Sequence, residues 1–377
     1  MEKYILELDL YKNFKCASEN CLLTCCSSWS IDIDEKTLER YKKLDKKFNG
    51  SLLENISANN KTIYLHKEYC PFLTSNQLCK IQLQFGHESL CKTCQIYPKT
   101  EHIYKNIITK ARLISCPEVL KQINKENYFC NKILTIEQTN EKETKEDKIE
   151  NLLFLSFYEK LKYLSNLKIS TKKMVNAFFT FSKDFDNFFA SAPKNEIVKS
   201  FNNTFNKQYF KNILKNKVLK KDYTQFFNFN EKIIFLAKTL ETKNFMFSNY
   251  IEEYKNLNVT EEHFTKYYSS FKKKLNKVVK TKQLFLYLLF VTLTDSFATK
   301  AFENRVKLAI TFISYVNILC FSSFLQDDLR IYNNFLKIIS NIFRVIFHGK
   351  FARNLDRSFN IPFFINTNFF ESMISFL

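Results

Sequence analysis

The feature that most limits the fold of this 377-residue chain is its scarcity of glycine, which occurs only at Gly50, Gly86 and Gly349. Loops that cradle nucleotide phosphates need several glycines close together, because only glycine lets the backbone approach the ligand so closely. The sequence therefore excludes dinucleotide-binding Rossmann enzymes and P-loop NTPases. It also disfavours the doubly wound methyltransferase fold, which has a glycine-rich nucleotide loop.

Apolar residues recur at helical spacing through most of the chain. Between Ile149 and Leu164 they mark one face of a helix, while charged residues occupy the other positions. The total of 41 Phe predicts a bulky aromatic core rather than an aromatic ligand box. Similar stripes occur at 172–190, 205–220, 230–240, 262–278, 282–294, 305–325 and 329–348.

The same pattern divides the chain into three segments. Residues 1–128 carry nearly all the cysteines, residues 129–148 are a charged connector, and residues 149–377 are predicted to be all-helical. We therefore predict a mainly α fold, in which a small cysteine-rich, metal-binding N-terminal module packs on a larger all-helical domain.

The segment Leu308–Leu325 contains no charged residue and has to be considered as a membrane span. It lies at the short end of the lengths that cross a bilayer, includes several Thr, Ser and Asn residues, and is closely flanked by Lys307 and Asp327. We expect a buried helix and no stable membrane insertion.

The formal net charge is +19, from 57 Lys and Arg against 38 Asp and Glu. Few of the basic residues are Arg, whose planar fork suits phosphates and base edges. The charge therefore favours a generically basic soluble protein with no nucleic-acid partner. A basic RNA-binding protein with a zinc-stabilised fold is the alternative.

Cysteine is concentrated near the N-terminus, where ten of the eleven precede residue 131. The opening MEKYILELDLYKNFKC lacks a basic segment followed by an apolar one, so we expect no signal peptide and a cytoplasmic protein. In a reducing compartment, dense thiols indicate metal binding before disulfides. The ten are Cys16, Cys21, Cys25, Cys26, Cys70, Cys79, Cys91, Cys94, Cys116 and Cys130.

The spacing of these thiols suits a site with four thiolates, which binds zinc or an iron–sulfur cluster. Only Cys91 and Cys94 have the C-x2-C spacing usual for zinc. Adjacent side chains such as Cys25 and Cys26 diverge, so this pair suits one ligand plus one structural thiol, or two different metal centres. A group of buried free thiols is the structural alternative.

Four motifs carry a resemblance to a known family. They are F-x-C-x4-C-x3-C-C-x2-W-x-I-x-I-D at Phe14–Asp34, C-P-F-L-x5-C-x-I at Cys70–Ile81, G-x3-L-x3-C-x2-Y-P at Gly86–Pro98, and S-C-P-E at Ser115–Glu118. In this order they resemble the flagellin lysine-N-methylase family, over roughly residues 11–120. Their core also resembles zinc- or iron-chelating proteins with a CxxxCC signature.

The resemblance implies that eight thiols are metal ligands or support them. They are Cys16, Cys21, Cys25, Cys26, Cys70, Cys79, Cys94 and Cys116. Cys91 occupies a position that is usually serine in the family and is taken as a spare thiol, and Cys130 and Cys320 match no family position. Two further departures are Ser28, where the family usually has glycine, and Lys99, where it mostly has arginine.

The resemblance further implies a cytoplasmic enzyme that methylates flagellin lysines, with S-adenosylmethionine as donor and a [4Fe–4S] cluster, or alternatively zinc, as cofactor. Methyl transfer needs a neutral amine and a surface that tolerates a sulfonium cation. Trp29, Tyr97 and Lys99 are the candidates for binding the donor, and Tyr97 and His348 for catalysis. His348 follows Arg344 in a pattern that resembles a late helix of the family. A non-enzymatic zinc- or iron-chelating protein is the alternative function.

Overall fold

A computed structural model shows a mainly helical protein with a small region of strands in its N-terminal part. The mainly α fold is therefore confirmed. The structure describes residues 2–29, 31–57, 59, 61–125, 129, 135–138, 144–192, 196–218, 220–240, 245–326, 331–348 and 367–377.

The apolar stripes coincide with helices, as their spacing predicts. Side-chain hydrogen bonds define where the first two helices of this part, α6 and α7, begin. Thr144 and Asp147 form a capping box for α6, and Ser170 caps α7. The stripe at 205–220 contains a shorter helix, and α11 was not predicted. The helices of this part are α6 (Lys145–Asn166), α7 (Thr171–Ser191), α8 (Ile197–Thr204), α9 (Lys207–Ile213), α10 (Tyr223–Leu240), α11 (Phe245–Asn256), α12 (Glu261–Val278), α13 (Thr281–Val291), α14 (Leu293–Thr299), α15 (Phe302–Gln326), α16 (Ile331–His348) and α19 (Thr367–Ser375).

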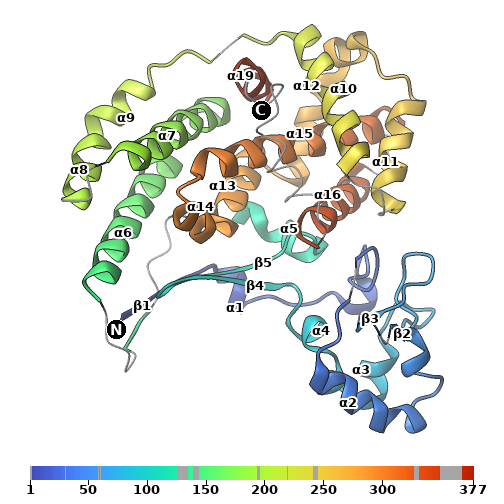
Figure 1. Ribbon diagram of the computed structural model, residues 1–377. Coiled ribbons are helices and arrows are strands. Elements are labelled where there is room, and N and C mark those ends of the chain that lie inside the picture. Colours follow the sequence, from blue (N-terminus) through green and yellow to red (C-terminus); the bar gives the residue numbers. More distant parts are fainter. Residues whose placement is uncertain are drawn as a thin grey trace.

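Helix α15 lies at the centre of this arrangement, between α6–α9 on one side and α10–α12 with α16 on the other (Figure 1). It packs against α7, α13 and α16. It is long and apolar enough to cross a membrane, but 83% of its apolar window is buried inside the protein. The prediction of a buried helix for Leu308–Leu325 is therefore confirmed.

A four-stranded sheet runs below these helices in the order β4-β5-β1-β6 (Figure 1). Strand β1 pairs in parallel with β5, with Tyr4 opposite Ile107, and the other neighbours are antiparallel. This pairing brings the start of the chain next to residues a hundred positions later. The strands are β1 (Glu2–Glu7), β4 (Lys99–Tyr104), β5 (Ile107–Arg112) and β6 (Thr135–Gln138), and α1 (Asp9–Lys12) and α5 (Pro117–Gln122) adjoin them.

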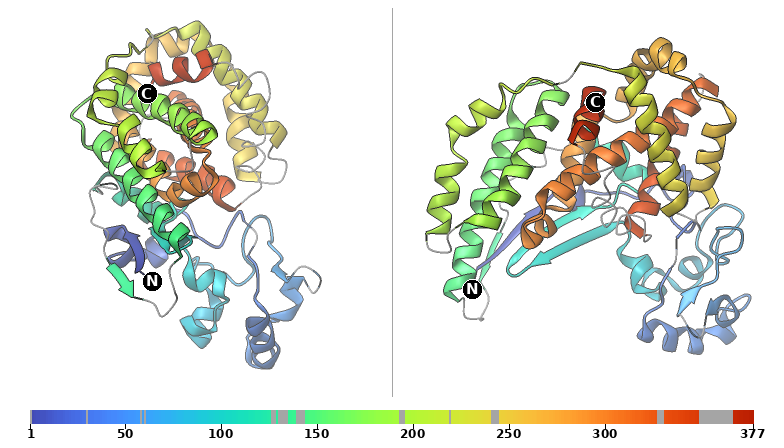
Figure 2. Two further views of the ribbon diagram at one scale, coloured as in Figure 1. Left: turned by 60° about the vertical axis from the view of Figure 1, so that its left-hand side comes forward. Right: turned by 45° about the horizontal axis from the view of Figure 1, so that its top comes forward.

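Most residues between α1 and β4 form a small lobe beside one end of the sheet (Figure 2). Its elements are α2 (Glu35–Leu44), β2 (Ile56–Ser57), β3 (Thr62–Ile63), α3 (Lys80–Phe85) and α4 (Lys92–Ile96). Asp34 begins α2 by accepting hydrogen bonds from the Thr37 amide and hydroxyl, and it also accepts one from the Lys92 amide. These hydrogen bonds fix α2 against α4 and hold the pKa of Asp34 at about 2 although burial opposes this.

Two hydrophobic cores are present in the described part of the chain. The large core joins the helices to β1, β5 and α5. It is rich in phenylalanine, as predicted; the rings of Phe157 and Phe185, for example, lie 4.6 Å apart. The small core lies within the small lobe and includes Tyr41 and Phe72. The division at residue 128 stays a prediction, and the cores show that part of the N-terminal segment packs with the helices.

Candidate metal and cofactor site

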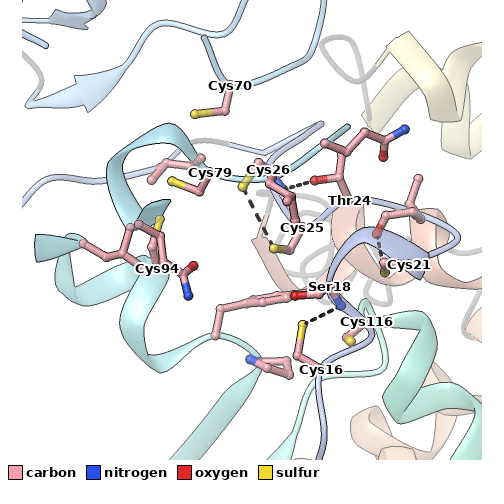
Figure 3. A pocket seen from close by; sticks show the side chains of 18 of the residues that line it. Cys16, Ser18, Cys21, Thr24, Cys25, Cys26, Cys70, Cys79, Cys94 and Cys116 are labelled. Atoms are coloured by element: carbon pink, nitrogen blue, oxygen red, sulfur yellow. Dashed lines mark hydrogen bonds between the residues drawn. The ribbon is translucent and has the colours of Figure 1, made fainter. Parts of the chain in front are cut away.

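A cavity of about 190 Å³ lies where the small lobe meets α5 and α16. All eight cysteines that the motifs select as ligands line it, and all eight are labelled in Figure 3. The structure thus brings together thiols that are up to one hundred residues apart in the sequence. They are Cys16, Cys21, Cys25, Cys26, Cys70, Cys79, Cys94 and Cys116.

Short helices position several of these thiols. Cys79 and Cys116 directly precede the first turns of α3 and α5. Backbone N–H groups of those turns form hydrogen bonds to both sulfurs and favour their thiolate forms, although burial raises both pKa values by a larger amount. Metal coordination removes the thiol proton, so these N–H groups suit a metal-bound thiolate.

The turn that carries Cys25 and Cys26 is held by hydrogen bonds to its backbone. The Cys25 carbonyl accepts from the Trp29 indole N–H at 2.7 Å, and the Cys26 carbonyl accepts from the Cys70 amide at 2.8 Å. The two sulfurs lie 4.0 Å apart, so they are in contact but not bonded. The pair is therefore held in place before any ligand binds.

Ser28 continues this turn in the left-handed region, with φ of 66°. Its amide donates to the Glu68 carbonyl at 2.8 Å, which pins the turn to the neighbouring loop. The family usually has glycine at this position, and the backbone keeps the conformation that glycine would favour. Serine in place of glycine therefore strains the backbone at this position and leaves the shape of the turn unchanged.

Replacing Ser28 by glycine is expected to stabilise the protein by about 1 kcal/mol, because glycine has no Cβ to clash in this conformation. Replacing it by valine, which is β-branched, is expected to destabilise by about 2 kcal/mol. Urea unfolding followed by circular dichroism measures both changes. Equal stability of the two variants would contradict strain at this position.

Arg344 reaches the same turn from α16 and is only 1% exposed. Its guanidinium donates to the Ser27 carbonyl and hydroxyl, the latter at 2.8 Å, and to the Leu23 carbonyl at 3.3 Å. Its partners in the described part of the chain are therefore uncharged oxygens, and its buried Nε has no partner there. A buried cation without an anion is costly, so a negative group in the cavity would be well placed.

Cys25 is the thiol most affected by this charge. A hydrogen bond from Cys26 lowers the pKa of Cys25 against the opposing effect of burial, and the charge of Arg344 lowers it further. For Cys70, by contrast, burial is the dominant effect and raises the pKa to about 12. Protein atoms surround Cys25 densely, but its side chain faces the cavity and is therefore exposed.

Trp29 and Tyr97 form an aromatic pair in the cavity wall, with ring centroids 5.5 Å apart. The Tyr97 hydroxyl lies 3.1 Å from the Ser115 hydroxyl, a partner that the sequence motifs alone did not reveal. Burial raises the pKa of Tyr97 well above its usual value. Its phenol therefore stays protonated at neutral pH, which suits positioning through the ring better than proton abstraction.

Lys99, another predicted site residue, lies apart from this pair. Lys99 is exposed on β4, with its ammonium 5.5 Å from the centre of the Tyr11 ring, and it does not line the cavity. His348 ends α16, but its side chain lies outside the described residues. Glu118 lines the cavity and pairs with Lys121 at 2.6 Å.

The three cysteines without a predicted ligand role also differ in position. Cys91 is buried in the small core, forms a hydrogen bond with Cys94, and does not line the cavity. Cys320 is buried in α15 within the large core. Cys130 lies outside the described residues.

The donor set fits the chemistry of the cofactors that the motifs imply, since soft thiolates bind zinc and iron–sulfur clusters. Within the described part of the chain, however, no three His, Cys, Asp or Glu side chains stand in a geometry that would hold a metal ion. Binding therefore requires the thiols to turn about their Cα–Cβ bonds. Cysteine has three staggered positions for such a turn.

Comparison with known proteins finds relatives whose names agree with the family that the motifs indicate. Flagellar biosynthetic protein FliU of Salmonella muenchen is 29% identical over 120 residues. Two proteins named lysine-N-methylase are 28% identical over 120 residues, in Salmonella choleraesuis, and 29% over 119 residues, in Salmonella typhimurium. The resemblance to the lysine-N-methylases is confirmed.

This similarity covers a limited part of the chain. It takes in 29% of the present chain, 71% of FliU, and 30% of each Salmonella lysine-N-methylase. No family model matches the chain, and no solved structure matches it. Most of the chain therefore lies outside the regions shared with these relatives.

Proposed function

We propose that this chain is a protein-lysine N-methyltransferase that methylates flagellin, with S-adenosylmethionine as donor and a cysteine-ligated iron–sulfur cluster. The observation that carries the proposal is the convergence of eight motif-selected cysteines on one cavity, in a chain similar to proteins named lysine-N-methylase. The name of the FliU relative supports a flagellar substrate. The cytoplasm is the compartment in which free thiols and unexported flagellin meet.

The chain's own residues would act on the cofactors in distinct ways. The cavity thiols would hold the cluster, which supplies Lewis-acid or redox chemistry when bound. Arg344 would balance its negative charge from the α16 side. Trp29 and Tyr97 would offer aromatic faces to the sulfonium of the donor, and such faces attract cations.

Methyl transfer itself requires a lysine amine without its extra proton. The amine lone pair forms the new N–C bond as the S–C bond of the donor breaks, which turns the sulfonium into a thioether. The product amine then gives a proton to a base or to water. Burial of the lysine in a site of low polarity would lower its pKa and favour the reactive form. His348 as the base stays a prediction.

The experiment that tests this proposal is methylation of purified flagellin by the anaerobically purified protein. With a donor whose methyl group is isotopically labelled, we expect mass increments of one or more methyl groups on flagellin lysines. Peptide mapping identifies the lysines. If the protein contains iron and folds but adds no methyl group, the proposed activity is wrong.

The second candidate is a non-enzymatic zinc- or iron-chelating protein. The same eight thiols favour metal binding without catalysis. The shared region makes up 71% of FliU, which also favours this function. It predicts metal binding that is unchanged by S-adenosylmethionine. A shift in the optical spectrum of the iron-loaded protein on addition of the donor would count against it.

Tyr97→Phe is expected to reduce methylation by no more than about tenfold, because the phenol is not deprotonated and the ring is retained. Tyr97→Ala, which removes the ring, is expected to raise the KM for the donor. Steady-state kinetics with varied S-adenosylmethionine measures both. A complete loss of kcat in Tyr97→Phe would instead assign the hydroxyl a direct catalytic role.

A further inference from the structure

Strand β4 forms one edge of the four-stranded sheet, which has the order β4-β5-β1-β6. In an antiparallel pair, residues that exchange backbone hydrogen bonds alternate with residues whose N–H and C=O groups point away from the partner strand. The Leu113 amide donates to the opposite Pro98 carbonyl at 2.7 Å, so this pair is of the first kind. The alternation then directs the backbone groups of Lys99, Glu101 and Ile103 toward the open side of β4.

These outward backbone groups are unpaired and accessible. Among the described residues, none forms a backbone hydrogen bond with the N–H or C=O groups of Lys99, Glu101 or Ile103 on the open side. All three residues are exposed, and Ile103 is 66% exposed. An edge strand of this kind is a template on which another extended chain can pair. Several peptide-binding domains use such an edge, because the main chain provides affinity and the side chains provide specificity.

The open edge begins beside the cavity. Pro98, the residue before β4, lines the cavity, and so do Cys116 and Glu118, which follow β5. Figure 1 shows β4 running from the small lobe beneath the helices. A strand advances about 3.3 Å per residue, so a segment paired along Lys99–Ile103 has one end next to the cavity. A lysine a few residues beyond that end lies within reach of the Trp29–Tyr97 pair.

The face of the sheet next to this edge carries more cations than carboxylates. Three cationic side chains have their charged groups 5.5–5.8 Å from the centre of the Tyr11 ring: Lys99, Lys110 and Arg112. Glu101 accepts a hydrogen bond from the Tyr11 hydroxyl and lies 3.9 Å from Lys110. Glu7 of the neighbouring β1 pairs with Lys12 at 3.0 Å. An acidic segment would therefore complement this face.

A second copy of the chain fits the edge less well. If two β4 strands paired antiparallel along their full exposed length, Glu101 at the centre would lie opposite Glu101 of the other copy. Like charges directly opposite each other destabilise a strand pair. An acidic segment of another protein would instead meet Lys99 and its cationic neighbours.

We propose that the open edge of β4 binds an extended acidic segment of the protein substrate by strand addition, which places the acceptor lysine at the cavity. The placement of a lysine rests on the proposed function. The pairing of a polypeptide with the edge does not.

The first test is hydrogen exchange of individual backbone amides in the full chain, with and without purified unmethylated flagellin. We expect the amides of Glu101 and Ile103 to exchange rapidly in the free protein and at least about tenfold more slowly when flagellin is bound. The amides of His102 and Tyr104, which point toward β5, should be slow in both samples and are the internal control. This measurement needs no variant.

The second test compares two substitutions at Ile103. Proline removes the outward N–H but leaves the β4–β5 hydrogen bonds intact, because this N–H does not face β5. Ile103→Pro is expected to raise the KM for flagellin about tenfold through the lost hydrogen bond. Ile103→Ala removes the same side chain and keeps the N–H, so the rise should be smaller. Circular dichroism checks that both variants fold.

The outcomes separate this proposal from the proposed activity. Flagellin that is methylated without slowing exchange at Glu101 and Ile103 would overturn the docking alone. Slow exchange of these amides in the free protein, together with dimers in analytical ultracentrifugation, would assign the edge to a second copy and also overturn it. Flagellin that slows the exchange but receives no methyl group would support the docking and overturn the activity. Flagellin that neither binds nor is methylated would overturn both.

Discussion

Cys25→Ser is expected to reduce flagellin methylation to below about 1% of the unaltered activity while the protein keeps its fold. Serine replaces a soft thiolate by a hard, weakly acidic hydroxyl, so the metal group loses one ligand. Cys25 is the natural choice because it faces the cavity and both Cys26 and Arg344 favour its thiolate form. Methylation, iron content and helical circular dichroism are measured on the same preparation.

Cys91→Ser is the matched control for this change. Cys91 is a nearby cysteine of the same lobe, but it does not line the cavity, and the family usually has serine at its position. We expect Cys91→Ser to retain colour and most of its activity. If Cys25→Ser stays folded and fully active without iron, the thiol site is structural and catalysis lies elsewhere in the chain.

The helices and the thiol set could be predicted because their signals are local. Apolar spacing defines α6 or α7 within one stretch of sequence, and capping residues such as Thr144 define its start. The cysteine motifs are likewise short, and their order was sufficient to select the eight thiols that line the cavity.

The features that were missed depend on contacts between distant residues. The parallel pairing of β1 with β5 leaves no short-range signal, because each strand is brief and its partner lies a hundred residues away. Lys99 is predicted as a site residue because the family that the motifs resemble mostly has arginine at this position. It lies instead on an exposed position of β4, since the chain turns away from the cavity after Pro98.

The contacts of Arg344 are also long-range and could not be predicted from the sequence. Its place in a helical stripe and its spacing from His348 follow from the sequence, but nothing in the sequence indicates what it contacts. The structure shows that it is the link from α16 to the cysteine turn, across more than three hundred residues. A lone cation in an apolar helix stripe is therefore a signal that a buried polar partner exists elsewhere.

Arg344→Met is expected to destabilise the protein by about 3 kcal/mol, because the Ser27 hydroxyl and the carbonyls of Ser27 and Leu23 lose their buried donor. Methionine fills a similar volume, so lost packing contributes little. The variant should also lose iron, since the turn bearing Cys25 is released and the cluster loses its positive neighbour.

Arg344→Lys separates these two effects. Lysine keeps the charge but cannot reproduce the planar fork that reaches Leu23 and Ser27 together. We expect a smaller loss of stability, about 1–2 kcal/mol, and partial retention of iron. Urea unfolding measures the loss of stability. The reduction potential of the remaining cluster measures how far the positive charge is kept, because a neighbouring cation favours the reduced, more negative state. If both variants unfold like the unaltered protein and hold the same amount of iron, Arg344 neither anchors the turn nor balances the charge of the thiols.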